Sequence, residues 1–201
     1  MALAAEAVYR LDVLEALLEV NKSPIVIVHH GQAAWGGVMA VLQCIWCKGM
    51  FPDGEGPKHD YMESTPGCWA AYGGVLAREY QDRRYFTVHR LTVDAYAVQH
   101  PGTQRRQSIQ SVGVHLVRLC LLLERGLAPD KANDAMRAAA RHKAQYHWLE
   151  PPASLGAITV ADVEAAAGIE NHMSVVEDWA SQMWAVWSPH HSTVRSWANR
   201  A

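Results

Sequence analysis

Apolar residues recur at helical spacing along most of this chain, and polar or Pro/Gly-containing connections separate the periodic segments. An amphipathic helix is predicted over 3–20. Beyond Trp69 the pattern is helical throughout, with predicted helices at 69–82, 86–99, 107–125, 130–145, 160–168, 172–187 and 190–199. The pattern therefore predicts an all-α fold, an irregular multi-helix bundle preceded by a loop-rich N-terminal lobe.

Length and composition indicate one domain. The chain has 201 residues, of which 50% are hydrophobic, and this is enough to bury one core. We expect a single helical domain over 39–201. It divides into a metal-binding loop lobe over 39–68 and a helical core over 69–201.

The lobe contains the segment MFPDGEGPKHD, which would be an unusually long loop without a fastening. Cys44 and Cys47 form a C-x2-C pair, the spacing at which two thiolates bind one tetrahedral Zn2+. His59 and Cys68 follow and supply a third and a fourth ligand. We therefore predict a structural zinc site at Cys44, Cys47, His59 and Cys68. A redox dithiol and small core residues are the alternative interpretations of these cysteines.

Two histidines and an aspartate lie on or next to the predicted helix over 86–99. His89 and His100 share one face but lie about 16 Å apart along the axis, too far to bind one metal ion. If HPGTQRRQ is the turn of an antiparallel hairpin, His115 comes to lie between His89 and Asp94. We predict His89, Asp94 and His115 as a catalytic group between helices. Such a group can perform acid–base chemistry or bind a second divalent metal.

A structural role is the competing interpretation of these histidines. His115 shares a helical stripe with Ser111 and Arg118, which is typical of a solvated helix face. The tryptophans near the C-terminus are typical of a core rather than of a ligand cage. Further candidates for ligands or hydrogen-bond partners are His100, His172 and His191.

Charge and hydropathy limit the partners. The formal net charge is -2 and no run of Lys and Arg exceeds two residues, so we expect no nucleic-acid partner. The apolar stretches are far shorter than the ~20 residues of a transmembrane helix, so we expect no membrane partner. Charged residues interrupt the N-terminal segment, unlike a secretory signal. We expect a cytoplasmic location, in which the four cysteines are reduced or bind metal.

Several motifs in a fixed order carry a family resemblance: C-x2-C, GPKHDYMESTPGCW, LAREY, VHRLTVDAYAVQHPG, VHLVRL, WLEPP, TVADV and VEDWASQMWAVWSPHHSTVRSW. The chain resembles an actinobacterial and proteobacterial family catalogued as domain of unknown function family 5946, over Cys44 to Trp197. The resemblance implies a shared site but no known activity. The positions that match the family's recurring polar residues are Cys44, Cys47, His59, Tyr61, Cys68, Trp69, His89, Asp94, Gln99, His100, His115, His172, His191 and Arg195.

Two functional hypotheses follow. The first is a metal-binding cytoplasmic enzyme, a hydrolase or group transferase that acts on a small molecule through a metal or a His/Asp pair. Within this hypothesis, hydrolysis or group transfer is favoured as the reaction class because no nucleotide fingerprint, phosphate loop or flavin motif is present. The second is a zinc-stapled helical interaction module without catalytic activity. A protein partner and a homo-oligomer both remain open.

The first 38 residues raise a separate question. Members of the resembled family begin only a few residues before the first cysteine, and VHHGQAAWGGV joins the first helix to the domain without a clear periodicity. We hypothesise that residues 1–38 are not native and that translation begins at Met39. The alternative is a native helix that docks on the domain through Leu11, Leu14 and Leu18. Intact-mass measurement on protein from the natural host distinguishes the two.

Overall fold

The computed structural model describes residues 40–200. Within that range the chain forms seven α-helices and one small sheet, which confirms the expected all-α fold with a loop-rich N-terminal lobe. The predicted helix over 3–20 and the hypothesis that residues 1–38 are not native lie outside the described residues. The helices are α2 (Pro66–Gln81), α3 (His89–Gln99), α4 (Arg106–Leu119), α5 (Pro129–Ala140), α6 (Val160–Ala165), α7 (Ile169–Val186) and α8 (His191–Ala198).

Short 3-10 or π-helical turns lie next to several of these helices. The η1 segment (Tyr85–Val88) leads into α3, and η2 (Cys120–Glu124), a π-helical turn, continues α4. The η3 segment (Lys143–Gln145) follows α5, and η4 (Ser188–His190) leads into α8. Each helix predicted from the periodicity beyond Trp69 is therefore present, with ends that differ by a few residues.

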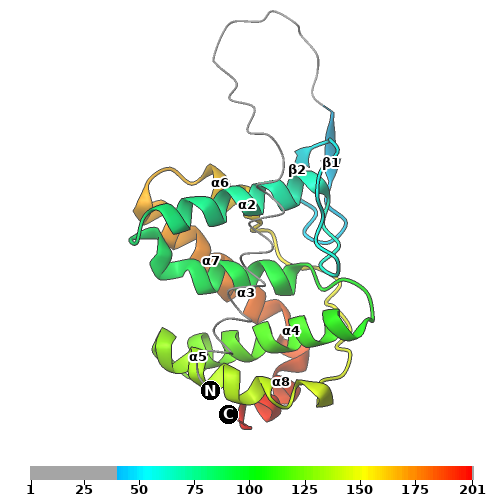
Figure 1. The fold of residues 1–201 in the computed structure, drawn as a ribbon, viewed down its shortest axis with the longest axis vertical. Helices are drawn as coiled ribbons and strands as arrows, with labels where there is room; N and C mark the ends of the chain where they lie inside the picture. Colours follow the sequence, from blue (N-terminus) through cyan, green and yellow to red (C-terminus); the bar gives the residue numbers. More distant parts are fainter. Residues whose placement is uncertain (1–39, 201) are drawn as a thin grey trace, which may run out of the picture.

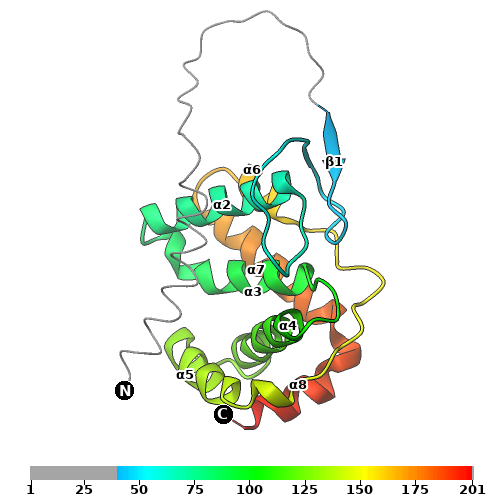
Figure 2. The same cartoon turned by 45° about the vertical axis from the view of Figure 1, so that its right-hand side comes forward.

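The helices stack in layers around α3 and α4. Figures 1 and 2 show α2, α3 and α4 one below the other, with α7 crossing behind them and α5 and α8 at the end farthest from the sheet. The indoles of two fully buried tryptophans connect α7 and its end to α3. Trp179 Nε1 donates to Gln99 Oε1 at 3.2 Å, and Trp187 Nε1 donates to the Val98 carbonyl at 3.2 Å. These tryptophans are core residues, as expected.

A sharp turn joins α3 to α4 and determines how these two helices lie against each other. Pro101 cannot continue the hydrogen-bond ladder of α3, and Gly102 follows with a φ of 66°, in the left-handed region that favours glycine. A Cβ at Gly102 would also collide with the Tyr61 carbonyl oxygen. The turn therefore reverses the chain and brings α4 back along α3, as the hairpin prediction required.

The N-terminal lobe contains a hairpin that the sequence pattern did not predict. Strand β1 (Val41–Gln43) pairs with β2 (Met50–Pro52) in antiparallel register, with Leu42 opposite Phe51. Each strand has only three residues, too few for alternation to be recognised in a sequence. Phe51 is buried and belongs to the hydrophobic core. The hairpin thus holds the turn with the first two cysteines against α2.

The described part of the chain has no helix that is both long enough and apolar enough to cross a membrane.

Candidate functional site

Four side chains from distant parts of the sequence meet between the lobe and the helices. The ligand atoms of Cys44, Cys47, Cys68 and His100 all lie within 4.8 Å of one another. Cys47 Sγ lies 3.9 Å from Cys68 Sγ, and His100 Nε2 lies 3.5 Å from Cys44 Sγ and 3.4 Å from Cys68 Sγ. All four residues are buried. This buried Cys3His group can bind a metal ion.

A tight turn between β1 and β2 positions Cys44 and Cys47 in the cluster. The Cys44 N–H donates to the Gly49 carbonyl at 2.9 Å, and the Lys48 N–H donates to the Cys44 carbonyl at 3.1 Å. Lys48 has a φ of 61°, so the turn is a constrained one. A Cβ on Gly49 would lie 2.7 Å from the Phe51 ring, which leaves room for glycine only. The C-x2-C-K-G sequence therefore encodes the turn as well as its ligands.

Cys68 reaches the cluster from the first turn of α2. The Thr65 hydroxyl caps this helix by accepting a hydrogen bond from the Cys68 N–H at 3.3 Å, and Pro66 starts it. The N-terminal end of a helix carries partial positive charge, which favours an anionic sulfur there. The capped helix thus holds Cys68 at the cluster, with the helix end offsetting part of the cost of an anionic sulfur.

His100 comes from the end of α3, and its tautomer is fixed by the backbone. Its Nδ1 lies 2.8 Å from the Tyr96 carbonyl oxygen, which can only accept, so Nδ1 carries the proton and Nε2 presents its lone pair to the sulfurs. The Tyr96 ring stacks on the imidazole at 4.1 Å, and the Tyr96 hydroxyl lies 3.6 Å from Cys68 Sγ. Tyr96 therefore orients two of the four ligands.

The three sulfurs influence one another's ionisation. The thiols of Cys47 and Cys68 donate toward Cys44, which lowers the pKa of Cys44. The same hydrogen bond to Cys44 raises the pKa of Cys47 to about 12, and contacts with both other sulfurs raise the pKa of Cys68. Three thiolates this close need a cation to offset their repulsion.

The structure differs from the predicted ligand set at one position. His59 was expected as the fourth ligand, but the fourth ligand atom in the cluster is Nε2 of His100. The His59 ring instead lies against the rings of Tyr61 and Trp69, at 4.3 and 5.0 Å. Sequence proximity favoured His59, whereas the turn at Pro101 brings the end of α3 under the lobe.

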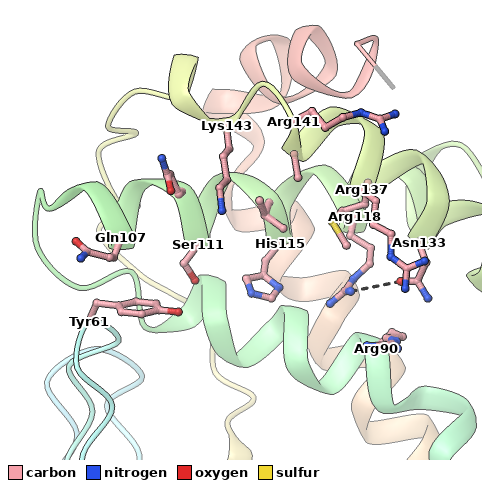
Figure 3. A pocket seen from close by; sticks show the side chains of 14 residues that line it. Tyr61, Arg90, Gln107, Ser111, His115, Arg118, Asn133, Arg137, Arg141 and Lys143 are labelled. Atoms are coloured by element: carbon pink, nitrogen blue, oxygen red, sulfur yellow. Dashed lines mark hydrogen bonds between the residues drawn. The ribbon is translucent and has the colours of Figure 1, made fainter. Parts of the chain in front are cut away.

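A pocket of about 570 Å³ lies on the far side of the α3–α4 hairpin, between α4, α5 and η3. Figure 3 shows the His115 ring between Ser111 and Arg118, with Tyr61 at one end of the pocket and Arg90 near the other. Basic side chains are prominent among its lining residues, and no lining residue within 40–200 is acidic. These basic residues are Arg90, Arg118, Arg137, Arg141 and Lys143.

His115 lines this pocket and is held by a buried carboxylate. Its Nδ1 lies 2.7 Å from Asp94 Oδ1, and Arg118 Nε donates to both oxygens of Asp94 at 2.9 and 2.7 Å. Burial alone would raise the pKa of Asp94, but Arg118 and His115 lower it below the usual value. Asp94 is therefore an ionised acceptor, so Nδ1 of His115 carries a proton and Nε2 is left for the pocket. Arg118 is 1% exposed, so the competing interpretation of this stripe as a solvated helix face does not hold at this residue.

His89, which was predicted to join Asp94 and His115, faces α2 instead. Its Nδ1 lies 2.8 Å from Oε2 of the buried Glu79, which also accepts from the Thr92 hydroxyl and lies 3.1 Å from His172 Nε2. Burial alone would raise the pKa of Glu79, but hydrogen bonds with His172, His89 and Thr92 lower it. The structure thus divides the predicted trio between two carboxylates: His89 pairs with Glu79, and His115 pairs with Asp94.

His172 and His191 take structural contacts. His172 belongs to the Glu79 cluster, and His191 stacks on Trp184 at 3.7 Å while its Nε2 donates to the Trp184 carbonyl at 2.8 Å. In the described range of 40–200, the Cys3His group is the only set of His, Cys, Asp and Glu side chains with metal-binding spacing. The second divalent metal that the sequence left open at His89, Asp94 and His115 therefore finds no assembled ligand set within the described residues.

Fold and site together define a small all-α protein with a buried Cys3His group at the junction of a hairpin lobe and a helical core. A family model matches residues 42–188, and the chain belongs to that family, the Family of unknown function (DUF5946). This confirms the resemblance seen in the sequence motifs. No curated protein and no solved structure matched the chain.

Proposed function

We propose that this protein is a zinc-stabilised enzyme that acts on a small molecule, a hydrolase or a group transferase, with Asp94 and His115 as its acid–base pair. The observation that carries the proposal is the hydrogen bond from His115 to the buried Asp94 at the wall of the pocket. Zinc has a structural role in this proposal. The chemistry takes place at the pocket.

The distances in the Cys3His group suit zinc. Tetrahedral Zn2+ with bonds of about 2.3 Å to sulfur and about 2.1 Å to nitrogen separates two sulfurs by about 3.8 Å and a sulfur from a nitrogen by about 3.6 Å. The corresponding distances here are 3.9 Å for Cys47 to Cys68, and 3.5 and 3.4 Å for His100 to two sulfurs. Four ligands leave no open position, and burial excludes a substrate, as in structural rather than catalytic zinc sites.

Zinc content tests this part directly. Purified protein should contain one zinc per chain by elemental analysis, and Co2+ substituted for zinc should give the absorption spectrum of a tetrahedral thiolate site. Cys47→Ser should lose both signals, whereas Cys120→Ser, which removes a buried cysteine outside the cluster, should keep both. Protein that folds and binds no metal would refute the zinc proposal.

The acid–base proposal follows from the orientation of His115. With Nδ1 donating to Asp94, the lone pair of Nε2 can accept a proton from water or from a substrate hydroxyl, and the resulting imidazolium faces a carboxylate. Arg118 keeps Asp94 ionised and fixed, so Asp94 acts by positioning His115. General acid–base catalysis of this kind contributes about 10²- to 10⁴-fold to a rate.

Generic substrates can test this activity. We expect the zinc-loaded protein to hydrolyse some members of a panel of chromogenic carboxylic and phosphoric esters, and His115→Gln to reduce that rate at least about 100-fold. His142→Gln removes an exposed histidine that does not line the pocket and should leave the rate unchanged. Equal rates for the two variants, or no turnover by the wild type, would favour the zinc-stapled interaction module.

A further inference from the structure

We infer that the pocket on α4 selects a small molecule that carries an anionic oxyacid group, a phosphate or a carboxylate, and that Arg137 and Lys143 bind this group. The inference rests on the proposed function for its choice of site, and it adds the chemical class of the ligand.

The charge of the pocket contrasts with that of the chain. The whole sequence has a formal net charge of -2, yet the pocket is lined by four arginines, a lysine and a histidine, and by no acidic residue within the described range. A concave surface with one sign of charge attracts ligands of the opposite sign, because its low-dielectric walls concentrate the field. The pocket therefore favours an anionic ligand.

Asp94 compensates the charge of Arg118, but the carboxylates of the described residues leave Arg137 and Lys143 largely uncompensated. Asp94, behind the wall, is fully buried and its contacts go to Arg118 and His115. Within residues 40–200 Arg137 pairs with Asp134, at 3.5 Å, and both side chains are largely exposed, so this pair contributes little and can open. Lys143 makes no side-chain hydrogen bond or ion pair within residues 40–200. Both groups can therefore turn to a ligand.

The basic groups come from separate elements and flank His115 in the pocket. Arg137 belongs to α5 and Lys143 to η3, and Figure 3 shows Lys143 above Ser111 and Arg137 beside Arg118 and Asn133, on either side of His115. Two cations that line one pocket from different elements suit a ligand with several anionic oxygens, because each oxygen can accept a charge-assisted hydrogen bond. Their position also places the bound anion near Nε2 of His115.

The size of the pocket indicates a small molecule rather than a nucleic acid. Its volume of about 570 Å³ lies within the range of small-molecule sites. Nucleic-acid surfaces instead show basic residues along an extended stripe or face. Neutral hydrogen-bonding side chains, among them Gln107, Ser111 and Asn133, line the same walls and suit the polar remainder of such a ligand.

Calorimetric titration of the full-length, zinc-loaded protein tests the inference with three probes, namely inorganic phosphate, pyrophosphate and citrate. Arg137→Gln combined with Lys143→Gln removes two pocket charges, whereas Arg83→Gln combined with Lys131→Gln removes two exposed charges elsewhere. We expect the wild type to bind at least one probe and the pocket variant to bind it at least about tenfold more weakly, because each lost charge-assisted bond is worth about a factor of ten or more. The matched variant should stay within about twofold of the wild type.

The outcomes separate the sources of the anion. Preference for phosphate or pyrophosphate assigns a phosphoryl group, and preference for citrate assigns a carboxylate. Absence of binding for all three probes, or equal weakening in both double variants, overturns the inference. Binding that depends on the pocket charges, together with ester turnover that does not depend on His115, leaves this inference in place and refutes the proposed catalytic role.

Discussion

The two faces of the α3–α4 hairpin use histidine in opposite ways. His100 presents Nε2 to three sulfurs in a closed cluster and is 1% exposed, whereas His115 presents Nε2 to a pocket and its side chain is 14% exposed. In both, an acceptor fixes the proton on Nδ1, a backbone carbonyl for His100 and a carboxylate for His115. A carbonyl orients a metal ligand, while a carboxylate can also stabilise a charged imidazolium. The difference separates a stabilising site from a reactive one.

Loss of a cluster ligand should have the largest effect on the molecule. Cys68→Ser leaves three ligands and removes the sulfur that links α2 to the lobe, so zinc and its contribution to folding should be lost. Structural zinc contributes on the order of 10 kcal/mol of apparent free energy in small zinc domains, so a cost of several kcal/mol is expected. Denaturant titration and metal analysis measure it. The matched change Cys120→Ser, at a buried core cysteine, should keep the metal; if Cys68→Ser does so too with wild-type stability, the cluster has no structural role.

Replacing His100 and His59 in turn should show which of them is the fourth zinc ligand. The structure places His100 in the cluster, whereas the sequence spacing favoured His59. His100→Ala should lose tightly bound zinc, because Nε2 completes the tetrahedron. His59→Ala should keep one zinc per chain, while losing the ring contacts with Tyr61 and Trp69, worth about 0.5–1.5 kcal/mol each, and the hydrogen bond that His59 Nδ1 accepts from the Tyr61 N–H. Elemental analysis after dialysis against a mild chelator shows the difference. The reverse result would restore the ligand set expected from the spacing alone.

The same contrast shows how far the sequence could predict the site. The C-x2-C pair and Cys68 were recognisable because thiolate spacing is local, and the seven helices because their periodicity is strong. The fourth ligand depends on how α3 packs under the lobe, which spacing does not encode. One signal was present, since His100 directly precedes Pro101 and Gly102 and so ends a helix with its ring held over Tyr96.

In the pocket, too, contacts across a short turn could be predicted from the sequence, and contacts that depend on helix packing could not. The hairpin register placed His115 beside Asp94, because both lie on elements joined by a short turn. The partners that decide the chemistry were not predicted: Glu79 takes His89, and Arg118, which resembled a residue of a solvated face, is buried against Asp94. Polar residues on helical stripes look alike in a sequence whether they face water or a buried charge, so only packing separates them.

Removal of the Asp94 carboxylate should have an intermediate effect. Asp94→Asn leaves Arg118 buried with an uncompensated charge, which typically costs about 3–5 kcal/mol. His115→Gln removes only the partner that reaches the pocket and should cost about 1 kcal/mol or less. Urea denaturation of the two variants at neutral pH measures the difference. Equal stability of the two variants would show that the Asp94–Arg118 ion pair does not stabilise the fold.

Acidification should lower the stability of the fold by protonating the buried carboxylates Asp94 and Glu79. The folded pKa of Asp94 and of Glu79 lies below the unfolded values of 3.8 and 4.5, so each stabilises the fold above its unfolded pKa and loses that contribution as pH falls through the folded value. The free energy of unfolding should therefore decline as pH falls below about 4.5. In Asp94→Asn the decline should be shallower than in the wild type. Denaturation curves between neutral and acidic pH test this, and identical slopes would contradict it.

Replacing the pocket cations Arg137 and Lys143 should change the stability of the fold least, in contrast to loss of a ligand in the Cys3His group. Arg137 and Lys143 are exposed, and within residues 40–200 their one ion pair joins Arg137 to an exposed Asp134. Their replacement by Gln should change the free energy of unfolding by no more than about 0.5 kcal/mol, since exposed pairs contribute little. Crowded positive charges also repel one another, so a slight gain in stability at low salt is expected, and it should vanish as salt screens the charges. Thermal denaturation at two salt concentrations measures both effects. A large loss of stability would show that these cations hold the fold together, and then weaker anion binding by the same variant would no longer indicate a ligand site.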